Sequence, residues 1–204
     1  MTLTYVTGNL GKYYSVKEKF AKHNLPVEFL KYDFEEPEIN DIELISKAKV
    51  EEAYKLLNKP CFVADSGFYI KNYPGNPGYP GAFAKRSGIS ENVELLLEKM
   101  NGVQDREACF LDCVTFYDGN EFYTFYGLCE GAITYEPRGC HMQKAKSKLW
   151  YVFIPKNHDK TLAEMTDNER NNRHDDHTSA YEEFINWYEK VYLTQKKLTK
   201  KSNS

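Results

Sequence analysis

The stretch Leu3-Thr4-Tyr5-Val6-Thr7-Gly8-Asn9-Leu10-Gly11-Lys12 joins a short apolar segment to a helix-like segment, Tyr13 to Asn24. Its β-branched and aromatic residues favour a strand, and Gly8 and Gly11 let the backbone turn tightly and approach a ligand. The free N–H groups and positive dipole end of the helix, with Asn9 and a lysine, can hold phosphate oxygens. Taken alone, this junction leaves two interpretations open: a phosphate site, or a capped turn without a ligand.

The bulk composition narrows the class of protein. With 204 residues, 41% hydrophobic and 28% charged, the chain is expected to form one globular domain over 1–195, followed by a polar tail over 196–204. A net charge of −3 argues against nucleic-acid binding. No apolar run is long enough to span a membrane, and the N-terminus lacks the apolar stretch of a signal peptide. Five scattered cysteines indicate reduced thiols in a cytoplasmic protein.

The order of predicted elements gives the fold class. Strands are expected over Leu3–Thr7, Val27–Tyr32, Cys61–Ala64, Ala108–Tyr117, Glu121–Glu130 and Tyr151–Ile154. Helices are expected over Tyr13–Asn24, Leu44–Leu57, Glu91–Met100, Leu162–Met165 extended toward Asn171, and Ser179–Leu193. Asp118-Gly119 is a strong hairpin signal. Early alternation followed by a hairpin predicts an α/β protein with a mixed sheet flanked by helices.

Two further segments carry groups suited to chemistry. An apolar strand ends in Asp65-Ser66-Gly67, which is a frequent way to build a site at a sheet edge; the alternative is an Asx turn and a surface loop. The run from Glu35 to Asp41 holds four carboxylates in seven residues, and carboxylate oxygens suit magnesium. Such a run is more often a solvated loop.

Together these segments resemble the inosine/xanthosine triphosphate pyrophosphatase family, and the resemblance covers nearly all of residues 1–190. The N-terminal motif T-G-N-x-x-K is matched by Thr7, Gly8, Asn9 and Lys12. The later family motifs are matched by Pro37-Glu38-Ile39-Asn40, Lys47-Ala48, Asp65-Ser66-Gly67, Gly75-Asn76-Pro77-Gly78, Asp105-Arg106-Glu107-Ala108-Cys109-Phe110, Gly131-Ala132-Ile133, Pro137-Arg138-Gly139, Phe153-Ile154-Pro155 and Thr161-Leu162-Ala163-Glu164-Met165.

The resemblance implies a long, bent mixed sheet with helices on its faces, two lobes and a central cleft. It implies magnesium-dependent attack of water on the α-phosphorus of a nucleoside triphosphate, which gives the monophosphate and pyrophosphate. It also implies a homodimer.

The roles that follow from the resemblance fall on matched residues. The phosphate chain is expected at Thr7, Asn9 and Lys12, with Lys47 as another positive charge. Glu38 and Asp65 would hold Mg²⁺, and Asp65 would also orient or deprotonate the attacking water. Ser66 and the Gly67 backbone would bind phosphate oxygens.

The departures from the family pattern lie mostly where the base is expected. Lys146–Tyr151 replaces a glycine-rich G-F-G-Y-D-P element, and there Trp150 either stacks on the base or belongs to the core. The S-H-R element falls on Asp175-Asp176-His177. Asp176 would accept a hydrogen bond from an amino group, and His177 could donate one; a polar helix cap is the alternative. Ala64 replaces the first acid of the D-D-S-G element.

Two hypotheses follow. In the first, the chain is an active pyrophosphatase with altered base specificity, because the phosphate and metal residues survive while the base readers have changed. In the second, it is a catalytically weak or inactive relative that binds nucleotides.

Overall fold

The computed structural model describes residues 2–35, 37–142, 145, 147–171, 173 and 178–195. The predicted tail, 196–204, lies outside this range. Among the described helices, none combines the length and the apolar character that crossing a membrane would require.

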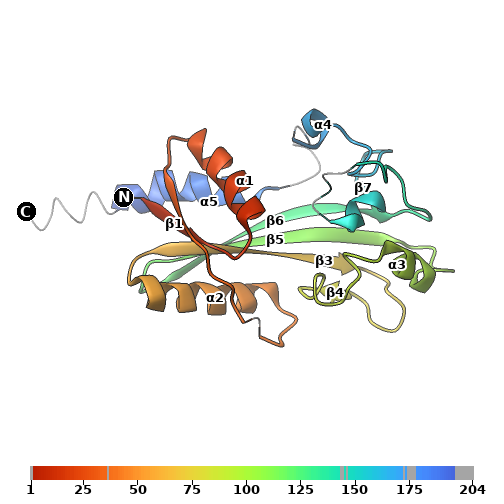
Figure 1. The fold of residues 1–204 in the computed structure, drawn as a ribbon, viewed down its shortest axis with the longest axis horizontal. Coiled ribbons are helices and arrows are strands. Elements are labelled where there is room, and N and C mark those ends of the chain that lie inside the picture. The colour runs from red at the N-terminus through yellow and green to blue at the C-terminus, as the bar shows by residue number, and fades with distance from the viewer. Residues whose placement is uncertain are drawn as a thin grey trace, which may run out of the picture.

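A mixed sheet forms the centre of the fold (Figure 1). Its strands are β1 (Leu3–Val6), β2 (Val27–Leu30), β3 (Cys61–Ile70), β4 (Pro80–Gly81), β5 (Glu107–Tyr117), β6 (Phe122–Ile133) and β7 (Phe153–Pro155). The strand order is β2-β1-β3-β5-β6-β7, and β4 pairs with β3. β1 is parallel to β2 and β3, whereas the other pairs are antiparallel. The predicted mixed sheet is therefore confirmed.

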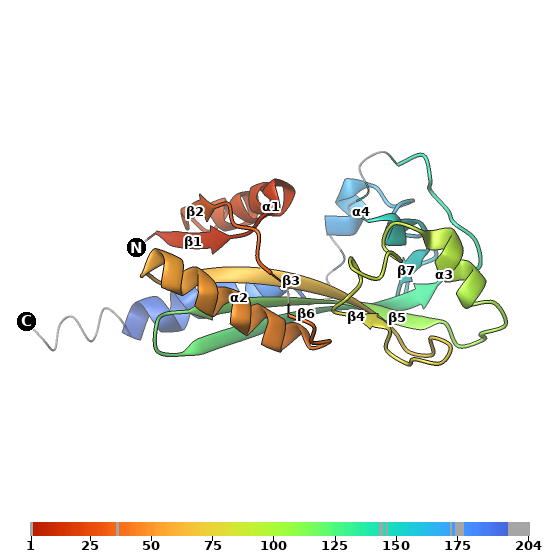
Figure 2. The same cartoon turned by 60° about the horizontal axis from the view of Figure 1, so that its bottom comes forward.

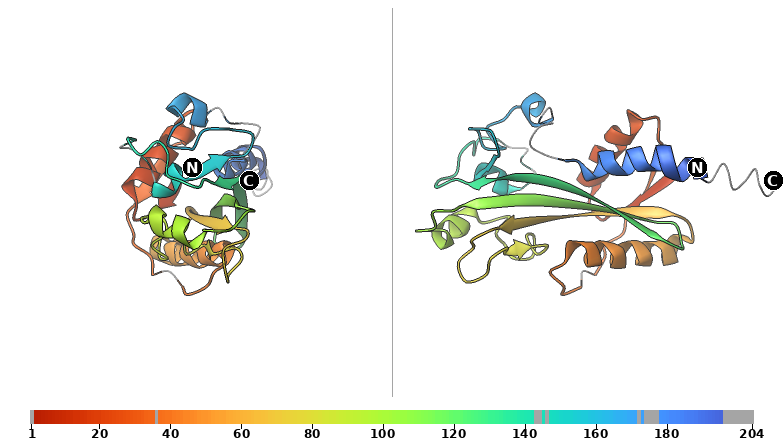
Figure 3. Two further views of the ribbon diagram at one scale, coloured as in Figure 1. Left: turned by 90° about the vertical axis from the view of Figure 1, so that its right-hand side faces the viewer. Right: turned by 180° about the vertical axis from the view of Figure 1, so that it is seen from behind.

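Helices flank both faces of the sheet. They are α1 (Leu10–Ala21), α2 (Ile42–Leu57), α3 (Val93–Lys99), the 3₁₀ turn η1 (Lys148–Tyr151), α4 (Asp167–Asn171) and α5 (Ala180–Trp187), which continues as the π-helical turn η2 (Tyr188–Tyr192). Asn9 and Asp41 cap the first turns of α1 and α2 with their side-chain oxygens. Figure 3 shows α5 and α2 on opposite sides of the long strands.

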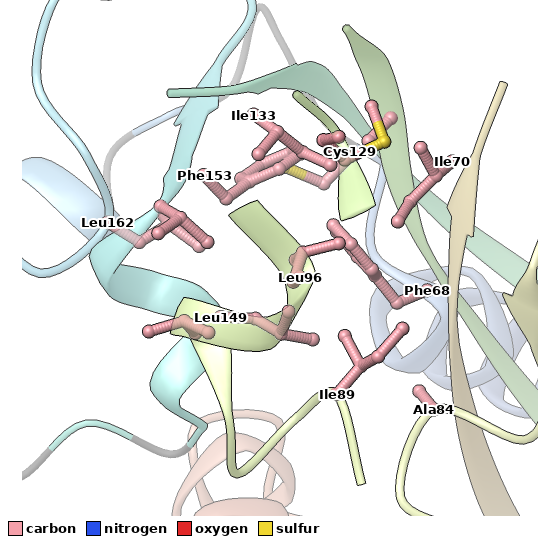
Figure 4. Packing of buried hydrophobic residues seen from close by; sticks show 14 of the residues in the cluster. Phe68, Ile70, Ala84, Ile89, Leu96, Cys129, Ile133, Leu149, Phe153 and Leu162 are labelled. Atoms are coloured by element: carbon pink, nitrogen blue, oxygen red, sulfur yellow. The ribbon is translucent and has the colours of Figure 1, made fainter. Parts of the chain in front are cut away.

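The molecule has two lobes (Figure 2), and the buried hydrophobic residues form separate clusters in them. In the first lobe, β1 and the early part of β3 pack against α1 and α5 on one face, around Phe62 and Phe184, and against α2 on the other, around Val50. In the second lobe, the far ends of β3, β5 and β6 pack against α3 and η1, around Phe68 and Leu96 (Figure 4). The long strands β3, β5 and β6 connect the lobes, as the family resemblance implies.

The sequence located most elements correctly and misplaced three. β5 and β6 form the expected hairpin, in which Gly119 adopts a φ of 98° and Asp118 accepts the N–H groups of Asn120 and Glu121. The prediction that a strand ends at Ala64 was wrong, because β3 continues to Ile70 through unbroken pairing with β5. The segment 162–165 is a turn rather than a helix. The strand expected over Tyr151–Ile154 is β7, which begins two residues later because Lys148–Tyr151 forms the 3₁₀ turn η1.

Candidate active site

The candidate site lies at an interruption in the pairing along one edge of β3. On that edge β1 pairs with β3 at Tyr5 and Phe62, and β4 pairs with it at Phe68 and Tyr69. Between these two points, in the part of the chain that the structure describes, no strand pairs with the edge of Ala64–Ser66. We call this segment the β3 gap. It lies where the two lobes meet, so groups from both can reach it.

The turn after β1 brings a helix N-terminus to the β3 gap. Asn9 Oδ1 accepts the N–H of Lys12 at 3.0 Å, and Thr7 Oγ1 accepts the N–H of Asn9 at 3.2 Å. Within the described residues, the N–H groups of Leu10 and Gly11 have no acceptor, as expected for the first turn of a helix. Thr7 and Asn9 therefore shape the turn, and the unpaired N–H groups are suited to bind an anion.

Lys12 points from this turn to the gap itself. Its Nζ lies 3.4 Å from the carbonyl oxygen of Ala64, one residue before Asp65. The expected phosphate lysine and the expected catalytic carboxylate thus occupy neighbouring positions, although the sequence separates them by more than fifty residues.

Position 8 requires a glycine because the side chain of Asp33 packs directly against it. A Cβ at this position would overlap the carboxylate of Asp33, which follows β2. The glycine lets two loops pack directly against each other at the end of the parallel strands β1 and β2, and this packing fixes the turn that begins α1.

Asp65 forms a largely buried ion pair with Lys49 of α2. Lys49 Nζ lies 2.5 Å from Asp65 Oδ1, and the two side chains are only 8% and 15% exposed. The other carboxylate oxygen, Oδ2, is buried and has no hydrogen-bond partner among the described groups. A buried oxygen without a partner is costly unless a ligand completes it, so Oδ2 is suited to accept from water or to bind a cation.

The lysine that pairs with Asp65 is Lys49, which no sequence motif singled out. Lys47 was expected as another positive charge for the phosphate chain. Lys47 instead pairs with Glu43 at 2.5 Å on the exposed side of α2. The sequence did contain a signal: Ile42, Ile45, Ser46, Lys49, Val50 and Ala53 make up the buried stripe of the helix. A lysine on such a stripe requires a partner.

The loop with Glu38 is held at the other end of the gap. Asn40 Oδ1 accepts the N–H of Ala82 at 2.8 Å, immediately after β4. Glu38, two residues earlier, is exposed, and its carboxylate makes no hydrogen bond or ion pair with any described group. Asp41 is used as the N-cap of α2. Glu38 is thus available to a ligand near the β4 end of the gap.

Ser66 and Gly67 differ in access. Ser66 is exposed, whereas Gly67 is buried under β4. A Cβ on Gly67 would lie 2.7 Å from the ring of Tyr69 and 3.0 Å from the carbonyl oxygen of Gly81. Gly67 therefore permits the close approach of β4. This packing explains the glycine independently of any contact between its backbone and phosphate.

The groups expected at the base lie in the second lobe or outside the described residues. Trp150 is half-buried against the core of the second lobe, and the guanidinium of Arg170 lies over its ring at 5.3 Å. One face of the indole is therefore already covered. Asp176 and His177 lie outside the described residues.

The oxygen ligands at the β3 gap suit a hard cation that takes only one or two of its ligands from the protein. Asp65 Oδ2 and the Glu38 carboxylate are oxygen ligands without partners, and magnesium is commonly bound by one or two carboxylates plus water and substrate phosphates. In the described part of the chain, no three His, Cys, Asp or Glu side chains cluster closely enough to form a metal site by themselves. These residues therefore suit a metal ion whose other ligands come from water and the phosphates of a bound substrate.

A separate hollow of about 560 Å³ lies on the sheet of the second lobe, between Tyr69, Cys109, Glu130 and Ile154. None of the expected site residues lines it.

Comparison with known proteins decides the family. The model of the Ham1 family matches residues 3–187. The chain belongs to the Ham1 family. The dITP/XTP pyrophosphatase of Saccharolobus solfataricus is 31% identical over 188 residues, which cover 90% of this chain and 92% of the relative. The corresponding protein of Methanopyrus kandleri is 31% identical over 191 residues, or 92% of this chain and 96% of the relative.

A solved structure agrees with the Ham1 fold. The Staphylococcus aureus Ham1 protein superposes with a TM-score of 0.72 at 23% identity, over 95% of this chain and 99% of that one. The fold expected from the sequence resemblance, a mixed sheet flanked by helices, is confirmed.

Proposed function

We propose that this Ham1-family chain is a magnesium-dependent nucleoside triphosphate pyrophosphatase. It would hydrolyse (d)NTP to (d)NMP and pyrophosphate and act on deaminated or otherwise non-standard purine nucleotides. The observation that carries the proposal is the meeting of the α1 N-terminus and Lys12 with Asp65 at the β3 gap. The names of the curated relatives, dITP/XTP pyrophosphatase, support the same activity.

The residues at the gap can divide the work of phosphoryl transfer, which requires positioning and charge neutralisation. Lys12 and the unpaired N–H groups of α1 would hold the triphosphate. Lys49 holds the orientation of Asp65 through Oδ1, and Asp65 would orient or deprotonate the attacking water. Ser66 would donate to a phosphate oxygen. Mg²⁺, held by Glu38 and Asp65 together with water, would neutralise charge on the phosphates.

Base recognition is the part of the proposal in which this chain differs from its family. Trp150, Asp176 and His177 replace the usual elements, and an aspartate accepts hydrogen bonds but cannot donate them. We propose a preference for a purine nucleotide other than inosine or xanthosine triphosphate, with the part of the half-buried Trp150 indole that Arg170 does not cover as a stacking surface.

The proposal also covers the oligomeric state and the cellular location of the protein. We propose a homodimer, tested by light scattering after size-exclusion chromatography; a monomeric mass at micromolar concentration would contradict it. We also propose a cytoplasmic location, supported by five cysteines that are all free.

The activity is tested with a nucleotide panel. Wild type and Asp65→Asn are incubated with Mg²⁺ and each common or deaminated (d)NTP, and pyrophosphate release is measured. Turnover by wild type and a loss of roughly 10²- to 10⁴-fold in the variant are expected, which is the range for removal of a general base. Stabilisation by a triphosphate without turnover would instead favour the inactive, nucleotide-binding relative.

A further inference from the structure

The α5-side face of the three long strands is apolar except for one interruption along its length. Side chains alternate between the faces of a strand, and the continuous register of β3, β5 and β6 identifies which residues share this face. Toward the first lobe these residues are apolar and packed under α1 and α5, as with Phe62 and Phe116. Toward the second lobe they are apolar again and packed near α3 and η1, as with Phe68.

Between the two cores lies one row of three directly opposed residues, Ser66, Asp112 and Gly127. We call it the floor row. Gly127 is covered, because a Cβ there would lie 2.7 Å from the backbone N of Ala180 at the start of α5. Ser66 and Asp112 retain access to solvent.

Asp112 is the only charged residue on this face of β3, β5 and β6, all of which the structure describes. The other residues on the face are Phe62, Ala64, Phe68, Ile70, Ala108, Phe110, Val114, Phe116, Tyr123, Phe125, Cys129, Gly131 and Ile133, with Ser66 and Gly127 in the row itself. A single carboxylate between two apolar cores is destabilising unless solvent or a ligand satisfies it.

No structural role in the described chain accounts for Asp112. Its carboxylate makes no hydrogen bond or ion pair with a described group, although it is partly buried. The nearby helix α5 is capped by Ser179, whose Oγ accepts the N–H of Glu182 at 3.4 Å. Burial raises the pKa of Tyr5 to about 12, and the charges of Asp65 and Asp112 add to that shift. Asp112 therefore lies near the buried phenols of Tyr5 and Tyr181, because its charge also adds to the raised pKa of Tyr181.

The position of Asp112 relative to the phosphate groups restricts what it can contact. Ser66 belongs to the β3 gap, and Asp112 is its partner on the next strand inward, about 4.8 Å further from the open edge. Lys12 belongs to α1, which packs on this face of the sheet, and Trp150, the proposed stacking residue, packs with the second-lobe cluster on the same face. A nucleotide that extends from Lys12 toward Trp150 would therefore cross the floor row. A carboxylate only accepts hydrogen bonds and repels phosphate, and no described group of three ligands surrounds it to hold a metal.

We infer that Asp112 is a specificity-determining residue that accepts a hydrogen bond from a donor on the nucleoside. That donor is one that differs between nucleotides: an N–H group of the base or the 2′-hydroxyl of the sugar. The inference rests on the proposed function and deepens it, because it assigns nucleoside recognition to a described residue of the sheet.

The test uses ATP, dATP, ITP and dITP. The deoxynucleotides lack the 2′-hydroxyl, and inosine has an N1–H donor and a 6-oxo acceptor where adenosine has an acceptor N1 and a 6-amino donor. Wild type, Asp112→Ala and the near-isosteric Asp112→Asn are compared by kcat/KM for pyrophosphate release. Asp159→Asn removes one carboxylate from an exposed loop and serves as the matched control. Thermal melting without nucleotide establishes that each variant is folded.

A selective loss is expected. Asp112→Ala should lose roughly 10- to 100-fold on the nucleotides that carry the recognised donor and little on the others, as for a hydrogen bond to a charged group. Loss confined to one base identifies the base N–H, and loss confined to ATP and ITP identifies the 2′-hydroxyl. An unchanged profile, or an equal change on all four nucleotides, overturns the inference.

The proposed function can fail separately. If wild type releases no pyrophosphate from any of the four, nucleotide-dependent shifts in melting temperature are compared for the same proteins. A selective loss of stabilisation in Asp112→Ala would then retain the inference without the enzyme. Stabilisation that does not depend on position 112, or no stabilisation of wild type, overturns it.

Discussion

Lys49 Nζ lies 2.5 Å from Asp65 Oδ1, and neither side chain is more than 15% exposed. A buried ion pair does not by itself imply high stability, because desolvation offsets its attraction. Removing one partner is different, since it leaves the other charge buried and uncompensated. The pair therefore links the stability of the first lobe to the geometry of the site.

Lys49→Met is expected to lower the free energy of unfolding by about 3–5 kcal/mol, measured by urea denaturation at neutral pH. Lys47→Met is the matched control. Its pair with Glu43 is 36% and 39% exposed, so its loss should cost at most about 1 kcal/mol. Equal effects of the two substitutions would show that Lys49 is not buried against Asp65 in solution. In a double-mutant cycle with Asp65→Asn, the two losses should not add.

The buried thiols give a prediction that depends on pH. Burial raises the pKa of Cys61 to about 12 and that of Cys113 to about 11, whereas Cys140 is exposed. Because the thiolate is the reactive form, iodoacetamide at pH 8 should label Cys140 and leave Cys61 and Cys113 unmodified until urea is added. Mass spectrometry of the peptides provides the measurement, and rapid labelling of Cys113 in the folded protein would contradict the packing of β5.

The raised pKa values of Cys61 and Cys113 also make the free energy of unfolding depend on pH. A thiol has a pKa of about 8.5 when unfolded, so above that pH the unfolded chain releases these protons before the folded chain does. The contribution is therefore complete below about pH 8.5 and is lost as the pH rises through the raised folded values. Unfolding midpoints in urea should fall between pH 8.5 and 11, and replacing both cysteines with alanine should reduce that slope.

Short sequence motifs predicted the elements whose structure depends mainly on residues that are close together in the chain. Asp118-Gly119 gave the hairpin correctly, because this dipeptide suits the turn in any context. Asp65-Ser66-Gly67 has the composition of a turn, and the end of β3 was misplaced there. Pairing with β5 keeps these residues in a strand, and that interaction involves residues more than forty positions away in the sequence.

Only part of the candidate site was predicted, because some of its residues can be recognised only from contacts between distant segments of the chain. Lys12, Glu38 and Asp65 were selected because they match spaced motifs, and their roles in the site stay predictions. Lys49 was detectable only from its place on the buried stripe of α2, and Asp112 only from the strand register, which shows that it lies between two cores. A carboxylate in an alternating strand otherwise looks like an ordinary solvent-facing residue.

Gly127→Ala is expected to destabilise the protein by about 1–3 kcal/mol, as for other overpacked positions. The added Cβ would lie 2.7 Å from Ala180 N and 2.8 Å from Thr178 O, both of them backbone atoms. Gly11→Ala is the control, because its Cβ would meet only Asn9 Oδ1 at 3.2 Å and alanine favours a helix. Thermal melting without nucleotide compares them. A Gly127→Ala variant as stable as wild type would mean that α5 does not start against β6.

Asn40→Ala tests whether the Glu38 loop belongs to the metal site. The substitution removes the 2.8 Å hydrogen bond to Ala82 N, an interaction of about 0.5–1.5 kcal/mol, and leaves Glu38 and Asp65 in place. If Glu38 holds Mg²⁺, loosening its loop should raise the Mg²⁺ concentration for half-maximal pyrophosphate release by roughly 2- to 10-fold. Mn²⁺ binding followed by electron paramagnetic resonance should weaken in parallel. Asn101→Ala, at an exposed position after α3, should change neither quantity. An unchanged metal requirement in Asn40→Ala would separate the Glu38 loop from metal binding, leaving Asp65 as the protein carboxylate at the β3 gap.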